Sequence, residues 1–410
     1  MHPNSYFTRT FNYWSSRGIP GPKPVVLLGT IWQVFTKSIP ELSMHNYQLY
    51  GKVYGVFFGT RPMLVVADPE LIKEINIRDF HNFVDHNDIK TGDPLQDRSL
   101  FNLMGDEWKA MRSVISPTFS SGKMRAMHPI ITDCVHRLDQ YLETKAINGD
   151  ELDVKRAMGN LTMDVIASCA FGTQIDTHND HKTHEFVENA RQVIRGNWRI
   201  WLVLTIPAMF PKLMDYIKIS SLSPSVETFF RSAVSISTII ARRKSEINSG
   251  KHKDYLQLIL NAQNRSADNS EDQDIDDLNE HIFGTTDALN DQKSRKVDMT
   301  DDDVLASSFL FLVAGYETTA TLLSHLIYEL SVNEKCQQRL YEEINAFDGN
   351  YSYESIARMP FALMEAKTAV AHLITKYRFK RTANTAVPLK YKKFEFMLTT
   401  GDIHIGIEKR

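Results

Sequence analysis

A short run of small and hydroxyl-bearing residues, inside a long apolar segment, is the part of the sequence best suited to chemistry. Ala314 and Thr318 are four residues apart and Gly315 lies between them. On a helix this spacing puts Ala314 and Thr318 on one face, and glycine removes bulk from the surface, so a flat or diatomic molecule could approach. A threonine hydroxyl both donates and accepts, and the adjoining acid Glu317 could supply a proton. We predict Thr318 and Glu317 as catalytic candidates for reductive cleavage of oxygen on iron.

A purely structural explanation of the same residues stays open, in which small residues let two helices pack closely and Glu317 lies on a solvent-exposed face.

The helix that carries these residues has clear sequence signals at its start. Thr300 followed by three aspartates is an N-cap with acids in the first turn, and the helix is expected to run from about Asp301 to Val332. Glu317 and His325 interrupt its apolar run, which argues against a membrane span.

The remaining pattern predicts a mainly α protein with a small β-sheet. Two β-type runs, Val53–Phe58 and Met63–Val66, flank a hairpin signal, and Asp68 with Pro69 then opens a helix. Apolar residues recur at helical spacing in five further segments. These are Trp108–Phe119, Pro129–Leu142, Met158–Phe171, Phe186–Ile194 and Val226–Ile247.

Composition excludes several classes of protein. The 410 residues include 42% hydrophobic and 24% charged residues with a formal charge of -3, so the chain is globular and not built to bind nucleic acid. Its three cysteines are widely spaced, which predicts neither a disulfide framework nor a metal site.

Residues 1–19 form an N-terminal arm without an apolar run of membrane-span length. The arm mixes aromatic with basic residues, and two explanations stay open: contact with a membrane interface, or a partly ordered arm. Three prolines make Ile19–Pro24 an extended hinge, and the absence of repeats favours a single domain over residues 20–410. The acidic stretch Asp268–Asp303 is predicted to be a solvated, mobile loop.

Five motifs follow one another along the chain: IPGPKP, FFGTRPMLVV followed by DPELIKEI, WKAMRSVISPTFSSGKM, MDVIASCAFG and AGYETT. With them the chain resembles the cytochrome P-450 superfamily of haem-thiolate monooxygenases, in its animal microsomal form, over nearly all of Pro20–Arg410. Near the C-terminus, FALMEAKTAVAHLITKYRF resembles the helix that follows the iron-ligating cysteine, and LTTGDIHIGIEKR resembles the terminal strand.

The resemblance implies roles for six residues. Trp108 and Arg112 match the pair that hydrogen-bonds a haem propionate, and Ala314 and Gly315 match the residues over the distal face of the haem. Thr318 and Glu317 match the catalytic threonine and its acid. The family also implies haem as cofactor, a small lipophilic substrate, an NADPH-dependent reductase as partner and a place at the endoplasmic reticulum membrane.

The family's ExxR helix, several strands and the loop FxxGxRxCxG have no counterpart, because Pro360 runs directly into Phe361. Ile356 stands at the offset of the ligating cysteine, and an isoleucine cannot bind iron. We therefore expect an incomplete cytochrome P-450 fold with a deletion between residues 360 and 361 and an open edge on the hairpin. Haem is expected not to bind, and the chain to lack activity.

Two alternatives to a monooxygenase follow. The first is a non-catalytic truncated isoform or incomplete gene product, that is, a pseudoenzyme. The second, ranked last, is a carrier that keeps an apolar cleft under the segment Phe186–Phe230. Because a hydrophobic anchor helix is also missing before the hinge, a cytoplasmic location stays open beside the membrane surface.

Overall fold

Helices dominate the structure, a computed structural model that describes residues 3–86, 94–175, 177–178, 192, 206, 236–245, 254–267, 299–346, 361–393 and 398–410. The α-helices are α1 (Pro3–Thr8), α2 (Ile39–Tyr50), α3 (Pro69–Lys73), α4 (Pro94–Asp97), α5 (Gly105–Ile115), α6 (Ser121–Asn148), α7 (Val154–Phe171), α11 (Ile236–Ser245), α12 (Tyr255–Ala267), α14 (Asp301–Val332), α15 (Glu334–Asn345) and α17 (Phe361–Lys376). Short single turns are η1 (Ser15–Arg17), η2 (Ile31–Phe35), η3 (Glu74–Arg78), η4 (Phe80–Asn82) and η5 (Ser116–Phe119). The strands are β1 (Val53–Phe58), β2 (Arg61–Val66), β3 (Leu152–Asp153), β4 (Tyr377–Lys380) and β5 (His404–Lys409). The fold class is confirmed as mainly α with small antiparallel sheets.

The predicted hairpin is present as β1 and β2, which pair from Val53 opposite Val66 to Phe58 opposite Arg61. The second strand begins at Arg61, two residues earlier than predicted, and so includes Pro62. Proline lacks a backbone donor and is tolerated in edge strands. Within the described ranges β2 has β1 as its only strand neighbour, in agreement with the expected open edge.

The proline-rich segment lies along the opposite edge of the hairpin. The backbone N–H of Gly55 donates to the carbonyl of Pro20 at 2.8 Å, and that of Thr30 donates to the carbonyl of Phe57 at 2.8 Å. A Cβ at Gly21 would lie 2.1 Å from the oxygen of Gly55, so only glycine allows this approach. The segment Ile19–Pro24 belongs to neither a helix nor a strand, in agreement with its prolines.

The N-terminal arm packs on the hairpin through Trp14. The indole Nε1–H donates to the carbonyl of Val56 at 3.1 Å. The ring itself covers Gly55, where a Cβ would meet Trp14 Cγ at 2.1 Å. At least this aromatic side chain of the arm is therefore occupied by protein contacts.

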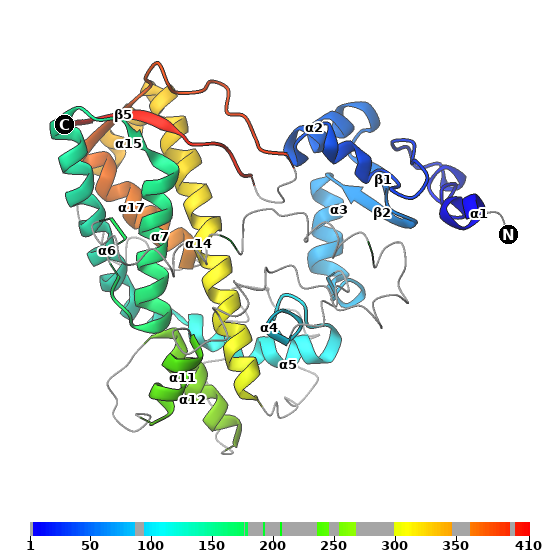
Figure 1. The fold of residues 1–410 in the computed structure, drawn as a ribbon, viewed down its shortest axis with the longest axis horizontal. Helices are drawn as coiled ribbons and strands as arrows, with labels where there is room; N and C mark the ends of the chain where they lie inside the picture. The colour runs from blue at the N-terminus through cyan, green and yellow to red at the C-terminus, as the bar shows by residue number, and fades with distance from the viewer. Residues whose placement is uncertain are drawn as a thin grey trace.

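Helix α14 is the centre of the helical part of the molecule, with α7 and α17 on one side and α4 and α5 near its lower half (Figure 1). It spans Asp301–Val332 with Thr300 as its N-cap, as predicted. Arg98, which directly follows α4, holds the start of the helix, since Nε and Nη2 donate to the two carboxylate oxygens of Asp303 at 2.7 and 2.9 Å. Of the described helices, only α14 is long and apolar enough to cross a membrane, but its contacts are those of a core helix.

The C-terminal segment differs from the prediction in one place. Helix α17 ends at Lys376, and the next residues form β4 instead of extending the helix. Pairing with β5 accounts for this, because Tyr377 lies opposite Lys409 and its side chain is almost fully buried. The predicted terminal strand is present as β5, which joins β3 and β4 into one sheet in the order β3-β5-β4.

The other predicted helices divide between described and undescribed residues. Trp108–Phe119 corresponds to α5 and η5, Pro129–Leu142 lies within α6, and Met158–Phe171 lies within α7. The predictions for 186–194, 186–230, most of 226–247 and most of 268–303 lie outside the described residues, as does residue 360.

Candidate functional site

The predicted pair on α14 lies on one exposed strip of the helix. Ala314 and Thr318 are both exposed, and Leu322, one turn further on, is 42% exposed. The hydroxyl of Thr318 donates to the carbonyl oxygen of Ala314, one turn back on the same helix. Glu317 beside it is half-buried. The fold therefore leaves a small-residue surface with a hydroxyl at its centre.

Gly315 faces a different way from Ala314. A Cβ at this position would lie 2.3 Å from Cδ1 of Ile166 on α7, so glycine is what allows α7 and α14 to pack this closely. Its neighbour Tyr316 is buried on the same contact, near Gly159. The structure thus shows close helix packing at Gly315 and an open helix face at Ala314, and the catalytic explanation of Thr318 and Glu317 stays a prediction.

An aromatic cluster of Phe119, Tyr255, Phe311 and Phe361 lies next to this strip. Tyr255 of α12 stacks on Phe311 of α14 with centroids 4.2 Å apart and ring planes at 9°. Phe361, the first residue of α17, lies 5.7 Å from Phe311. Because Phe311 precedes Ala314 by one helical turn, the cluster brings α12 and the start of α17 beside the AGYETT segment.

Trp108 and Arg112 lie on α5, one turn apart and both half-buried. The ring of Trp108 packs against Phe80 with centroids 6.1 Å apart. Burial lowers the pKa of Arg112, and the neighbouring Tyr255 partly opposes that change. Arg112 is thus joined to the exposed strip through Tyr255 and Phe311, and an anion placed at its guanidinium would offset the cost of burying the charge.

All three cysteines lie in described residues, away from the strip. Cys134 and Cys169 are buried, and Sγ of Cys134 lies 4.0 Å from Oγ of Ser168 at the interface of α6 and α7. Burial raises the pKa of Cys134 to about 12 and that of Cys169 well above its ordinary value. Both side chains are therefore neutral thiols at pH 7.

Cys336 is the exposed cysteine and the third residue of α15. That helix starts where α14 ends, and the fourteen residues from Thr318 to Val332 span about 21 Å at 1.5 Å per residue. Cys336 is thus held near the far end of α14 from the AGYETT segment.

Glu365 on α17 is a residue that the sequence analysis missed. Its side chain is fully buried, and both carboxyl oxygens lack a hydrogen-bond partner among the described residues. Burial raises the pKa of Glu365 well above its ordinary value. The signal available in the sequence is a lone acid within the apolar helix FALMEAKTAVA.

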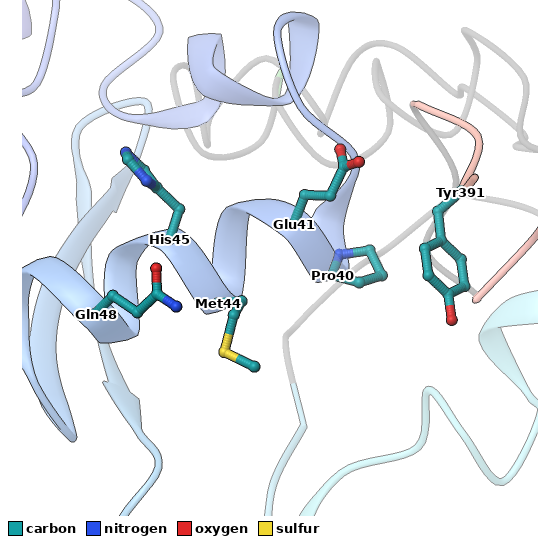
Figure 2. Close-up of a pocket in the computed structure, with 6 residues that line it drawn as sticks. All are labelled: Pro40, Glu41, Met44, His45, Gln48 and Tyr391. Atoms are coloured by element: carbon teal, nitrogen blue, oxygen red, sulfur yellow. The ribbon is translucent and has the colours of Figure 1, made fainter. Parts of the chain in front are cut away.

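A shallow hollow of about 390 Å³ lies elsewhere, between α2 and the segment around residue 391. Figure 2 shows its lining, with the α2 residues spread along the helix and Tyr391 beside the Pro40 end. The lining residues are Pro40, Glu41, Met44, His45, Gln48 and Tyr391. None of the residues predicted for catalysis or cofactor binding contributes to it.

The comparisons with known proteins decide the family. The family model for cytochrome P450 matches residues 19–362. The chain belongs to the cytochrome P450 family. This family explains the order of motifs from the proline hinge to AGYETT, and the family model matches as far as Ala362, two residues beyond the junction of 360 and 361. The resemblance to the cytochrome P-450 superfamily that the sequence motifs indicated is confirmed.

Several curated cytochrome P450s align with most of the chain. Cytochrome P450 6B7 of Helicoverpa armigera is 31% identical over 365 residues, covering 87% of this chain and 67% of the relative. Cytochrome P450 3A41 of Mus musculus is 30% identical over 366 residues, covering 87% and 66%. Cytochrome P450 3A7 of Homo sapiens is 29% identical over 391 residues, covering 94% and 71%. The chain thus spans about two thirds of the length of these relatives.

Membership of this family implies haem, so the residues present can be tested against that group. The exposed strip around Thr318 and the half-buried guanidinium of Arg112 suit the distal face and a propionate. The donor set does not suit the iron, because Cys134 and Cys169 are buried within α6 and α7 and Cys336 lies at the far end of α14. The residues of this chain therefore do not fit a thiolate-ligated haem.

Proposed function

We propose that this chain is a non-catalytic cytochrome P450, which retains the distal half of the family's oxygen site and lacks the proximal half. The main support for this proposal is the position of the three cysteines. None of them lies where it could offer a thiolate to an iron beside the AGYETT segment. Haem in this family supplies oxygen activation, with the axial thiolate giving the electron density that favours O–O cleavage. Monooxygenation and electron transfer from a reductase to the haem depend on that ligand, so the proposal excludes both for this form.

The distal half is proposed to consist of the residues matched by motif. Thr318 would hold a proton at its hydroxyl and pass it from Glu317, Ala314 would leave room on the helix face, and Arg112 with Trp108 would bind a carboxylate. The exposure of Ala314 and Thr318 on one strip of α14, with Glu317 half-buried beside them, supports the first two roles. The cost of burying the Arg112 charge supports the third.

The proposed deletion between residues 360 and 361 has support from two observations. The family match ends at residue 362, and α17 begins at Phe361 directly against α14. The cleanest check that this form is made is a tryptic peptide running from Met359 to Lys367, since it crosses the junction. Its detection by mass spectrometry in the source cells supports a natural product, whereas finding only peptides that continue from Pro360 into other sequence would remove the premise.

Haem titration of the purified full-length chain tests the proposal. We expect weak binding, which Arg112→Leu weakens further because the guanidinium is the group suited to a propionate. The matched control Arg125→Leu changes an exposed arginine of α6 and should leave binding unchanged. Tight, stoichiometric haem binding with a thiolate spectrum would overturn the proposal.

A surface position at the endoplasmic reticulum membrane is proposed from the microsomal relatives. The arm supports it with Tyr6 and Tyr13, which are 37% and 36% exposed and which carry Arg9 and Arg17 over their rings. In a flotation assay the chain should therefore rise with anionic vesicles. The variant in which Tyr6 and Tyr13 are both changed to serine should no longer rise with them. Equal flotation of the two proteins would refute arm-mediated contact.

A further inference from the structure

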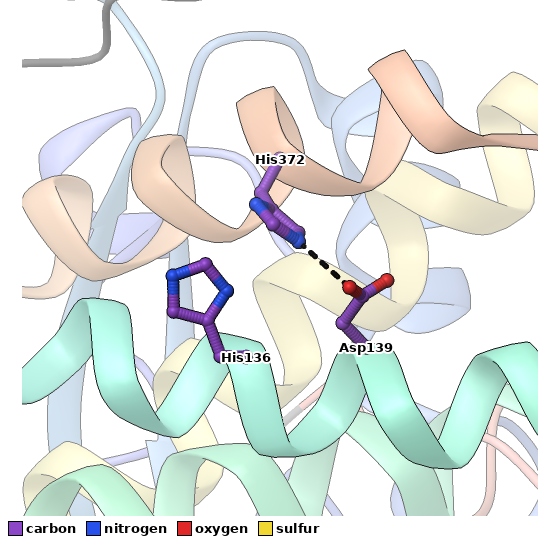
Figure 3. A group of neighbouring side chains, drawn as sticks. All are labelled: His136, Asp139 and His372. Carbon is purple, nitrogen blue, oxygen red and sulfur yellow. Dashed lines mark ion pairs between the residues drawn. The ribbon is translucent and has the colours of Figure 1, made fainter.

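Two histidines and an aspartate from two helices converge outside the region discussed so far. His136 and Asp139 are three residues apart on α6, and His372 faces them from α17 (Figure 3). One ligand atom from each lies within 4.8 Å of the others. The two imidazole rings are edge to face with centroids 5.0 Å apart, and Nε2 of His372 is 3.3 Å from Oδ2 of Asp139.

The donor atom Nε2 of His372 is buried and contacts Oδ2 of Asp139 at 3.3 Å. A metal ion bound between these two atoms would replace their contact with one coordination bond to each.

The surroundings of Asp139 resemble the outer shell of a metal site. The hydroxyl of Tyr377 donates to Oδ1 of Asp139 at 2.7 Å and so fixes the plane of the carboxylate. Lys376 donates to Oδ2 at 2.5 Å and holds the place that a metal cation would take. Its side chain is about half exposed, at 49%, so it can turn into solvent.

We propose that His136, Asp139 and His372 bind a single zinc ion that joins α6 to α17. Two imidazole nitrogens and one carboxylate oxygen match zinc, whereas calcium and magnesium prefer oxygen ligands alone. Zinc bonds of about 2.0 to 2.2 Å require the donors to close to about 3.4 Å. The side chain of His136 is exposed and can make that movement. The fourth coordination position of the zinc ion would then face solvent and bind water.

Isothermal titration of zinc alone into the full chain tests this proposal, in a Cys336→Ser background that removes the exposed thiol. We expect one saturable site whose affinity falls at least tenfold in His136→Ala. This variant keeps the fold, because the side chain is exposed. His136→Cys should retain binding, since a thiolate is also a zinc ligand, and Lys376→Met should tighten it by removing the competing cation.

The matched control His81→Ala changes an exposed histidine far from the cluster and should not alter binding. Unchanged affinity in His136→Ala and in His372→Ala would overturn the proposal, and so would the absence of saturable binding. Because none of these residues belongs to the AGYETT face, either result leaves the proposed loss of monooxygenation untouched.

Discussion

The ring of Phe361 packs on the ring of Phe311, with centroids 5.7 Å apart. One ring begins α17 and the other belongs to α14, one turn before Ala314. The helix that resembles the one after the iron-ligating cysteine of the cytochrome P450 family therefore contacts the helix that carries AGYETT, and its own sequence contains no cysteine.

Gly315 tests the contact of α14 with α7. Gly315→Ala should destabilise the chain by about 1 to 3 kcal/mol, because the new methyl group would meet Cδ1 of Ile166. Ile166→Val removes that atom, so the double variant should recover part of the loss in denaturant unfolding. The control Ala314→Val adds bulk to the exposed strip and should cost little. Additive losses in the double variant would show that the two residues do not touch.

Asp303 tests the start of α14. Asp303→Asn should cost about 1 to 3 kcal/mol, since it breaks the paired bonds from Arg98 and the capping bond to Thr300. Burial alone would raise the pKa of Asp303, but those bonds hold it below its ordinary value. This stabilisation is therefore present above about pH 4 and is lost as pH falls further.

The neighbouring Asp302→Asn provides the control, because Asp302 is exposed. The free energy of unfolding of Asp302→Asn should show the same pH dependence as that of the parent chain. If both variants lose equal stability, the Arg98 contact contributes nothing.

Glu365 gives the opposite pH dependence. Because its pKa is raised in the folded chain, the native state keeps a proton that the unfolded state releases, and stability falls as pH rises above about 4.5. Glu365→Met should remove this slope and stabilise the chain near pH 7 by about 1 to 3 kcal/mol. Glu343→Gln on the exposed face of α15 should do neither. A destabilised Glu365→Met protein would reveal a partner for the carboxyl group.

Leu64 tests the open edge of the hairpin. It is 44% exposed on β2, whose only described strand neighbour is β1. An unpaired apolar edge favours association, so Leu64→Lys should lower the aggregation rate measured by light scattering. Leu49→Lys on α2 removes an even more exposed leucine, at 61%, and should have the smaller effect. Equal effects would mean that general surface hydrophobicity, and not the strand edge, drives association.

The sequence predicted the parts of the fold that local rules determine. The Thr300 cap located α14 to the residue, and strand alternation located the hairpin. It extended α17 through Tyr377, because the strand β4 exists only through pairing with β5, some thirty residues further on. Long-range pairing of this kind leaves no periodic signal.

The candidate site was predictable only in part for the same reason. Helical spacing placed Ala314 and Thr318 on one face, as found. Spacing could not reveal that Gly315 faces Ile166, nor that Arg112 lies beside Tyr255, because both contacts join distant segments. The cluster of His136, Asp139 and His372 could not be predicted either, because it forms only where α6 packs against α17.

The reduced carbon monoxide spectrum of the haem-supplied, full-length chain tests the central claim most directly. The account predicts no Soret band of a thiolate-ligated carbonyl haem, because none of the three cysteines is placed to offer a thiolate beside Thr318. Single Cys→Ser variants at 134, 169 and 336 should therefore leave the spectrum unchanged. A thiolate band that disappears in any one of these variants would contradict the account and would name the cysteine that binds the iron.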